Sequence, residues 1–299
     1  MGLKIGVLAA EHVAAGAVEG QTIVGNIRRF PDRSDKDYLA EMPAEEIAQR
    51  IVEEIQIARE GQAIDCLGVG FPGIIGAGII EESPNLSQLK GQNFGVLLGS
   101  LLAESGISAS VHLLNDADAM AAGIAAARGQ LDRVVRVWFL GSGIGYGRYP
   151  LAGMTGEGGH TVVTLDPKEK FCQCGGVGHL EGIMGYRAMR RRFLDMEPEE
   201  VFAEAREGDA RCVAFVELWH RALAAATATS IHYEGPGKFY ISGPDSRFVQ
   251  TEMLQLYLRD MVKMSSLQGS AIEVIPTSDE IAIVGAAVSA EQALLKSEG

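Results

Sequence analysis

The 299-residue sequence has few cysteines, few basic side chains and no long apolar run. Four cysteines in a chain of this length cannot form the disulfide framework of a small secreted domain. No apolar run approaches the roughly 18 residues that a membrane-spanning helix needs. The first apolar segment, Ile5–Ala10, is interrupted by Glu11 and His12 and is shorter than the roughly 7–15 residues of a signal peptide. We therefore expect a cytoplasmic protein that begins with a β-strand.

The scarcity of basic side chains gives the chain a formal net charge of −13, from 26 Lys and Arg against 39 Asp and Glu. A charge this negative argues against nucleic acid or an anionic membrane as the main partner. The one basic cluster, Arg190–Arg192, is too short to offset it. Because 47% of the residues are hydrophobic and 22% are charged, the chain can bury a sizeable core and is not disordered.

Apolar periodicity predicts three short strands followed by alternating helices and strands, and this order occurs twice. The first half is expected to contain strands at Leu3–Leu8, Val13–Val18, Thr22–Arg28, Ile64–Gly70 and Val111–Leu114, and helices at Pro43–Glu60, Phe94–Glu104 and Asp116–Arg128. The second half is expected to contain strands at Val134–Leu140, Gly143–Tyr149, Thr161–Leu165, Lys238–Ser242 and Ile272–Ile275, a block of helices through Tyr233, and helices at Phe248–Lys263 and Ile281–Leu295.

A duplicated α/β pattern of this kind predicts two domains, with a ligand bound in the cleft where strand ends and glycine-rich loops converge. No low-complexity linker separates the halves, so the boundary is expected within the helix that follows Asn115. We predict a first domain of residues 1–117 plus 286–299 and a second of residues 118–285.

Two cysteines and two histidines within twenty residues can supply the four ligands of a tetrahedral zinc ion. They are His160, Cys172, Cys174 and His179. Buried structural cysteines are the alternative, but a Cys-x-Cys pair among glycines is typical of a loop, and its sulfur and nitrogen donors suit zinc best. Four protein ligands would close the coordination shell, so the metal would be structural. Cys66 and Cys212 lie in apolar segments and are expected in the core.

Polar residues at the end of an apolar strand form a second candidate group. Asn115 and Asp116 follow Leu113-Leu114 and precede an alanine-rich helix. Helix capping is the simpler interpretation, because Asn and Asp are good capping residues and a carboxylate suits a helix amino terminus. An Asp at the carboxyl end of a strand that faces a cleft could instead act as a general base.

Two glycine-rich segments leave alternatives open. Gly141-Ser142-Gly143 lies between two predicted strands and is either a plain hairpin turn or a turn whose N–H groups meet a phosphate. It is not a Walker A loop, because no Lys-Ser or Lys-Thr follows at the required place. In Gly156–His160, Glu157 precedes the predicted ligand His160 by three residues, so a metal could fix a loop that presents this carboxylate to a ligand.

In order along nearly the whole chain, these segments resemble the motifs of the ROK family of repressors, open reading frames and sugar kinases. The matching segments are Gly70–Gly73, Ser83–Leu86, Asn115–Ala119, Gly141–Gly145, Gly156–His160, Cys172–Gly178 and Gly285–Ala287. The resemblance implies an actin-like ATPase fold of the ribonuclease H-like type, duplicated, with two domains and a central cleft. The second of these domains would carry the zinc loop.

The same resemblance implies an ATP-dependent hexose kinase similar to glucokinases, with ATP bound together with Mg²⁺. Asp116 would be the base that takes a proton from the sugar hydroxyl. Asn115, Glu157, His160 and Glu181 would hydrogen-bond the sugar. Gly141, Ser142 and Gly143 would form the second phosphate-contacting loop, and Gly243 would lie near the adenosine. The partners would be a sugar and ATP, neither nucleic acid nor a membrane, in a homodimer or higher homo-oligomer. Family repressors carry a winged helix-turn-helix before the first strand. In this sequence the first strand is expected to begin at Leu3.

The sequence departs from the family pattern at three places. His179 stands where the family has a third metal-binding cysteine, and the loop before Gly156 is shorter than usual. Family kinases also have an Asp-x-Gly-Gly-Thr turn after the first strand, which meets the ATP phosphates and helps to hold Mg²⁺. Here Leu8–His12 contains no Asp, no Gly pair and no hydroxyl, and Glu11 is a poor substitute, given the strict geometry of Mg²⁺. The alternative hypothesis is therefore a weak or inactive relative that binds a sugar as a sensor or partner protein.

Overall fold

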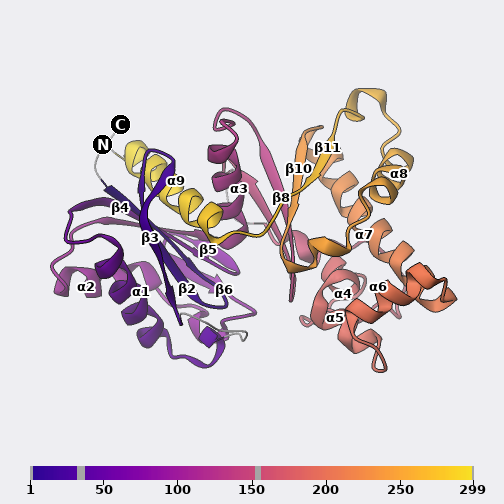
Figure 1. The fold of residues 1–299 in the computed structure, drawn as a ribbon, viewed down its shortest axis with the longest axis horizontal. Coiled ribbons are helices and arrows are strands. Elements are labelled where there is room, and N and C mark those ends of the chain that lie inside the picture. Colours follow the sequence, from indigo (N-terminus) through magenta and orange to yellow (C-terminus); the bar gives the residue numbers. More distant parts are fainter. Residues whose placement is uncertain (1–2, 32–37, 152–155, 298–299) are drawn as a thin grey trace. The chain divides into compact units, whose positions relative to one another are not determined.

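Two compact units make up the chain in the computed structural model, which describes residues 3–31, 38–151 and 156–297 (Figure 1). The first unit consists of residues 1–135, 147–156 and 278–299, and the second of residues 136–146 and 157–277. The predicted domains differ from these units, chiefly because residues 118–135 and 278–285 belong to the first unit.

A five-stranded sheet forms the centre of the first unit, in the order β3-β2-β1-β4-β7. Its strands are β1 (Leu3–Ala9), β2 (Val13–Glu19), β3 (Thr22–Phe30), β4 (Ile64–Phe71) and β7 (Ser110–Asn115). The first three are antiparallel neighbours, whereas β4 runs parallel to both β1 and β7. The carboxyl ends of β1, β4 and β7 therefore lie at one edge of the sheet, where Phe71 pairs with Asn115.

Four helices cover the two faces of this sheet: α1 (Ala44–Ala58), α2 (Phe94–Glu104), α3 (Asp116–Ala127) and α9 (Asp279–Ser297). Helix α1 buries Ile47, Ile51 and Ile55 at helical spacing, in one hydrophobic core with α2 and with Ile5 and Val7 of β1. Helices α3 and α9 pack along each other, and α9 also packs on β1 and β4 (yellow against indigo in Figure 1). A small hairpin that the sequence did not predict, β5 (Ile74–Gly76) and β6 (Ile79–Glu82), completes the unit.

Glycine allows α9 to lie directly on the sheet and on α3. A Cβ atom on Gly6 would lie 1.9 Å from the carbonyl oxygen of Ile283, and one on Gly68 would lie 1.9 Å from that of Ala286. A Cβ atom on Gly285 would likewise lie 1.8 Å from the carbonyl oxygen of Ala119. This close packing is the reason that α3 and α9 belong wholly to the first unit.

The second unit is built on a four-stranded sheet, in the order β11-β10-β8-β9. Its elements are β8 (Val135–Leu140), the first part of β9 (Ile144–Tyr149), β10 (Lys238–Ser242), β11 (Ala271–Val274), α4 (Leu180–Met184), α5 (Tyr186–Arg192), α6 (Pro198–Glu207), α7 (Ala210–Glu234) and α8 (Thr251–Met261). Val135 and the end of β9, residues 147–149, belong to the first unit. Short 3₁₀ helices lie at Tyr38–Glu41 and Ser87–Leu89 in the first unit and at Gly158–His160, Pro244–Phe248 and Ser265–Leu267 in the second. Trp138 and Trp219 lie in the core of the second unit.

The strand predicted at Thr161–Leu165 is wrong. Residues 161–165 form no strand, and Val162 makes only an isolated antiparallel bridge with His179. The N–H of Val163 donates to the carbonyl of Gly178, and the N–H of Leu180 donates to the carbonyl of Thr161, so this segment pairs with the cysteine loop. Among the described residues, no helix has the length and apolar character needed to cross a bilayer.

Candidate functional site

Asn115 and Asp116 lie where β7 passes into α3, at the carboxyl edge of the parallel strands. The Asn115 Oδ1 accepts hydrogen bonds from the backbone N–H groups of Ala117 (2.8 Å) and Asp118 (3.2 Å), which confirms that Asn115 caps the helix. Its Nδ2 donates to the carbonyl of Gly73, 2.9 Å away. Asn115 therefore joins the start of α3 to the turn that follows β4.

Asp116 is the first residue of α3 and is half-buried. Its Oδ1 accepts a hydrogen bond from the N–H of Ala117, 2.9 Å away. The positive end of the helix dipole favours the charged form of a carboxylate at this place. Asp118, to which the sequence analysis gave no role, is buried, and its Oδ1 accepts from the N–H of Arg148 (2.8 Å), which ties β9 to α3.

The turn between β1 and β2 stands where the family resemblance places its first phosphate loop. The N–H of Ala10 donates to the carbonyl of His12 (3.3 Å), and the N–H of Tyr38 donates to the carbonyl of Glu11 (3.0 Å). The His12 Nε2 lies 3.1 Å from the Oδ2 of Asp279, and the Arg29 Nε donates to that same oxygen at 2.8 Å. A carboxylate at the start of α9 thus fixes the side chain of His12.

Burial would raise the pKa of Asp279, but the hydrogen bonds and charges of His12 and Arg29 outweigh it and lower the pKa. Sequence reasoning missed this group because Asp279 is 267 residues from His12. Local spacing carries no information about such a pair.

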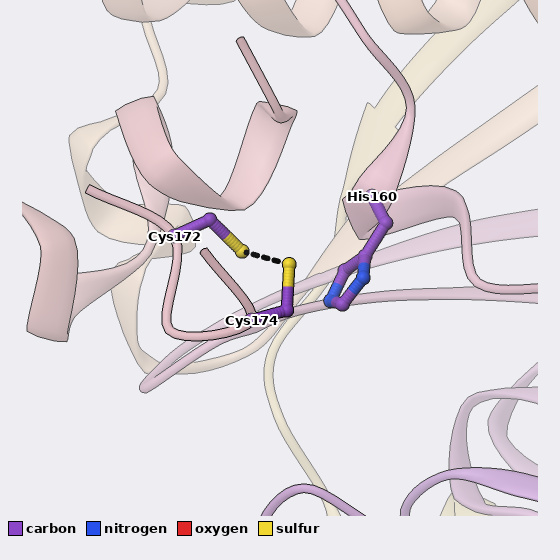
Figure 2. Close-up of side chains that lie close together, drawn as sticks. All are labelled: His160, Cys172 and Cys174. Carbon is purple, nitrogen blue, oxygen red and sulfur yellow. Dashed lines mark hydrogen bonds between the residues drawn. The ribbon is translucent and has the colours of Figure 1, made fainter. Parts of the chain in front are cut away.

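Three of the four predicted zinc ligands form a group that could hold a metal ion. The ligand atoms of His160, Cys172 and Cys174 all lie within 4.8 Å of one another. Figure 2 shows the two sulfur atoms pointing toward each other, 3.3 Å apart, with the imidazole of His160 beside Cys174. The fourth residue, His179, is outside this group, although its Nδ1 lies 3.2 Å from the Cys174 Sγ and its ring stacks on that of His160.

The donor set fits a thiophilic metal, because it combines two sulfur atoms with imidazole nitrogens. Burial raises the pKa of the Cys172 thiol to about 12, and a bound cation would deprotonate it. A Cβ atom on Gly176 would lie 2.0 Å from the His179 ring, so a larger residue there would displace this imidazole. The residues present therefore suit the predicted site.

Glu157 and Glu181 lie beside this group. The Glu181 Oε2 accepts a hydrogen bond from the N–H of Ile144 (3.1 Å), and its Oε1 lies 3.6 Å from the Cys172 sulfur. Burial raises the pKa of Glu157, an effect that His160 opposes and Glu181 reinforces. The second unit therefore brings together Glu157, His160 and Glu181, the three residues of this unit that the family resemblance assigns to the sugar.

The glycine turn after β8 lies next to Gly243 within the second unit. The carbonyls of Gly141 and Ser142 accept hydrogen bonds from the N–H groups of Tyr186 (2.9 Å) and Arg187 (3.4 Å), at the start of α5. A Cβ atom on Gly141 would lie 3.5 Å from Pro244. Gly243 has a φ of +99°, and its N–H donates to the Thr277 hydroxyl at 3.0 Å.

Comparison with known proteins assigns the chain to a family, because the ROK family pattern matches residues 21–293. The chain belongs to the ROK family. A glucokinase of Thermotoga maritima is 33% identical over 288 residues, which cover 84% of this chain and 87% of that protein. A glucokinase of Pyrobaculum calidifontis is 29% identical over 140 residues, covering 45% of this chain and 47% of the relative.

Solved structures of ROK proteins share the fold. The ROK hexokinase of Thermus thermophilus aligns with a TM-score of 0.80 at 22% identity, covering 98% of this chain and 99% of the other. A ROK glucokinase of Streptomyces griseus, solved with glucose and AMPPNP, aligns with a TM-score of 0.68 at 22% identity, covering 97% and 100%. These neighbours confirm the predicted actin-like ATPase fold.

Proposed function

We propose that this ROK-family chain is an ATP-dependent hexose kinase with Asp116 as its general base. The observation that carries the proposal is the position of Asp116, at the amino terminus of α3 and the carboxyl end of a parallel strand. Ligands of open α/β sheets bind at such strand ends. The relative from Thermotoga maritima, which is named a glucokinase, makes glucose the first sugar to test.

In the proposed reaction, a hydroxyl oxygen of the sugar attacks the γ-phosphorus of ATP. The new P–O bond forms as the bond from the γ-phosphorus to the β,γ-bridging oxygen breaks, and ADP leaves with that electron pair. Asp116 takes the hydroxyl proton. A positioned base contributes about 10²–10⁴ in rate, and positioning with charge stabilisation supplies most of the remainder in phosphoryl transfer.

Glu157, His160 and Glu181 would bind the sugar, and the family resemblance also assigns Asn115 a hydrogen bond to it. Carboxylates accept hydrogen bonds from hydroxyl groups, so a set of them in fixed positions can select one epimer. Asn115 already uses its Oδ1 for the helix cap and one N–H for Gly73, so its second N–H is the group left to donate to a sugar.

A structural zinc ion would be held by Cys172, Cys174, His160 and His179. The ion would join the short helix that carries His160 to the cysteine loop. Two backbone hydrogen bonds already link these segments, between Val163 and Gly178 and between Leu180 and Thr161. Glu157 and Glu181 flank the two linked segments, so the metal would fix their spacing.

In the second unit, the Gly141–Gly143 turn and Gly243 would contact ATP. The β1–β2 turn offers no hydroxyl group and no Asp to hold Mg²⁺, so any phosphate contact there must come from backbone N–H groups.

The resemblance also predicts a homodimer or higher homo-oligomer, which light scattering after size exclusion would check.

The deciding experiment is a panel of hexoses and amino-hexoses with Mg-ATP, measured for ADP release and for thermal stabilisation. Turnover of at least one sugar supports the kinase. Stabilisation by a sugar without ADP release at any protein concentration would refute it.

The turn at Ala10–His12 favours a second candidate function, a sugar-binding sensor or partner protein. The imidazole of His12 is committed to Asp279, and the turn lacks the phosphate-binding residues of family kinases. A sensor would be stabilised by its sugar to the same extent after Asp116→Asn and would release no ADP.

A further inference from the structure

Arg247, in the 3₁₀ helix after Gly243, has a guanidinium group that three neighbours hold in place. The guanidinium carbon lies 4.8 Å from the centre of the Phe248 ring. Its Nη2 donates to the Oε1 of Glu199 and lies 3.9 Å from the Oδ1 of Asp245. The side chain is nevertheless 54% exposed. A planar cation is thus pre-positioned at a surface that a ligand can reach.

Asp245 makes this arrangement costly for the fold. The residue is 1% exposed, and its Oδ2 has no hydrogen-bond partner among the described residues. Burial raises its pKa to about 6, an effect that Arg247 opposes and Glu199 reinforces. A buried carboxylate whose cation is 3.9 Å away contributes little to stability, so its presence calls for another explanation.

Arg247 and its neighbours Asp245, Glu199 and Phe248 border the glycine turn of the second unit. Pro244, next to Asp245 in sequence, packs on Gly141. Tyr186 donates its backbone N–H to the carbonyl of Gly141 and its hydroxyl to the Oε2 of Glu199, 3.2 Å away. These contacts close a ring from the glycine turn through Tyr186, Glu199 and Arg247 back to Pro244.

Charge indicates which part of a ligand would bind here. Two carboxylates surround one guanidinium, so the group carries a net negative charge and would repel a phosphate. Its exposed guanidinium can stack on a planar base, and the Glu199 carboxylate can accept hydrogen bonds from hydroxyl or amino groups. A nucleoside offers a planar base together with such donors.

We propose that Arg247 is the stacking platform for the nucleoside of the phosphoryl donor, with Asp245, Glu199 and Phe248 as its positioning residues. The inference rests on the proposed function, because it takes the donor to be a nucleoside triphosphate. It adds a residue that selects a nucleotide over a donor without a base.

The test compares Arg247→Lys with a matched control. Lysine keeps the positive charge that Asp245 needs but loses the planar face. Arg211 is another exposed, ring-stacked arginine of the second unit: it lies 4.5 Å over the Phe193 ring, pairs with the exposed Asp195 at 2.9 Å and is 53% exposed. Arg211→Lys is therefore the control for the loss of an exposed, ring-stacked arginine.

Wild type and both variants are measured for the KM of ATP and of the sugar, for ADP affinity by calorimetry, and for competitive inhibition by ADP and by inorganic triphosphate. Arg247→Lys should weaken the binding of ATP and ADP about tenfold. The KM of the sugar and the inhibition by inorganic triphosphate should stay unchanged. Arg211→Lys should change none of these values. The unchanged KM of the sugar also shows that the variant is folded.

Two results would overturn the inference. The first is an unchanged KM of ATP and an unchanged ADP affinity in Arg247→Lys. The second is an equal weakening of inhibition by inorganic triphosphate, which would assign Arg247 to the phosphates. A wild-type protein that neither binds ADP nor phosphorylates any sugar would instead refute the proposed function. The two failures are therefore distinguishable.

Discussion

His12 and Asp279 meet across 267 residues of sequence, with the His12 Nε2 3.1 Å from the Asp279 Oδ2. His12 ends the turn after the first strand, and Asp279 begins the last helix. Arg29, from β3, donates to the same oxygen. The contact joins the turn that stands where family kinases have their first phosphate loop to the first residue of α9, within the first unit.

This contact predicts a pH dependence of stability. The pKa of Asp279 is lowered from its ordinary 3.8 in the folded protein, so its contribution is fully present above the unfolded pKa and is lost as pH falls through the lowered one. Asp279→Asn should therefore be less stable than wild type at pH 7, and the difference should begin to shrink as the pH falls below about 4 and disappear only below the lowered pKa of the folded protein. Urea unfolding from pH 7 to pH 3 measures this. Asp260→Asn, which alters an exposed carboxylate, is the control.

Substitution of the proposed base should separate chemistry from binding. Asp116→Asn should lower kcat by about 10²–10⁴ and leave the affinity for the sugar within a few fold, because the amide cannot take the proton. Steady-state kinetics gives kcat, and sugar-dependent thermal stabilisation gives binding. A variant that keeps wild-type kcat would remove Asp116 from the mechanism.

The zinc proposal predicts about one zinc ion per chain. Cys174→Ser should lose the metal and lower the melting temperature, since Cys174 is exposed and its loss leaves no core cavity. His179→Cys should keep the metal, because it restores the three-cysteine pattern of the family. Metal analysis with thermal unfolding checks both variants, and an intact, metal-free wild type would contradict the ligand assignment.

A buried ion pair in the first unit should contribute far more than an exposed one. Lys4 is 2% exposed and donates to Glu291 (2.7 Å) and to the carbonyl of Gly20 (2.8 Å). Lys4→Met leaves the Glu291 carboxylate, whose side chain is 22% exposed, without its partner and should lower the free energy of unfolding by about 1–3 kcal/mol. Lys263→Met, at an exposed pair with Asp260, should change it little. Similar losses in urea unfolding would show that burial does not decide the effect.

Local sequence patterns correctly predicted several of the helices and strands that position the site. Helix α2 and strand β10 have the predicted bounds, and β7 passes into α3 at the predicted residue. Of the four predicted metal ligands, His160, Cys172 and Cys174 lie in one group, and His179 lies beside it with its Nδ1 3.2 Å from the Cys174 Sγ.

The missed features depend on contacts distant in sequence. The apolar segment Thr161–Leu165 has the composition of a strand but pairs with the cysteine loop, a partner that periodicity cannot identify. The assignment of residues 118–135 and 278–285 to the first unit follows from glycines that let α9 approach α3 and the sheet. The sequence did not single out Asp245, because this carboxylate is unusual only in being buried, which the sequence does not show.

The close fit of α9 has a consequence for the order of events during synthesis. The first unit takes residues from both ends of the described chain, so its sheet leaves the ribosome long before the helix that covers one face. Until α9 has been translated, the face of the sheet that holds Gly6 and Gly68 has no helix against it at these glycines, whereas the second unit needs nothing beyond residue 277. The half of the protein that is made first is therefore the half that finishes folding last.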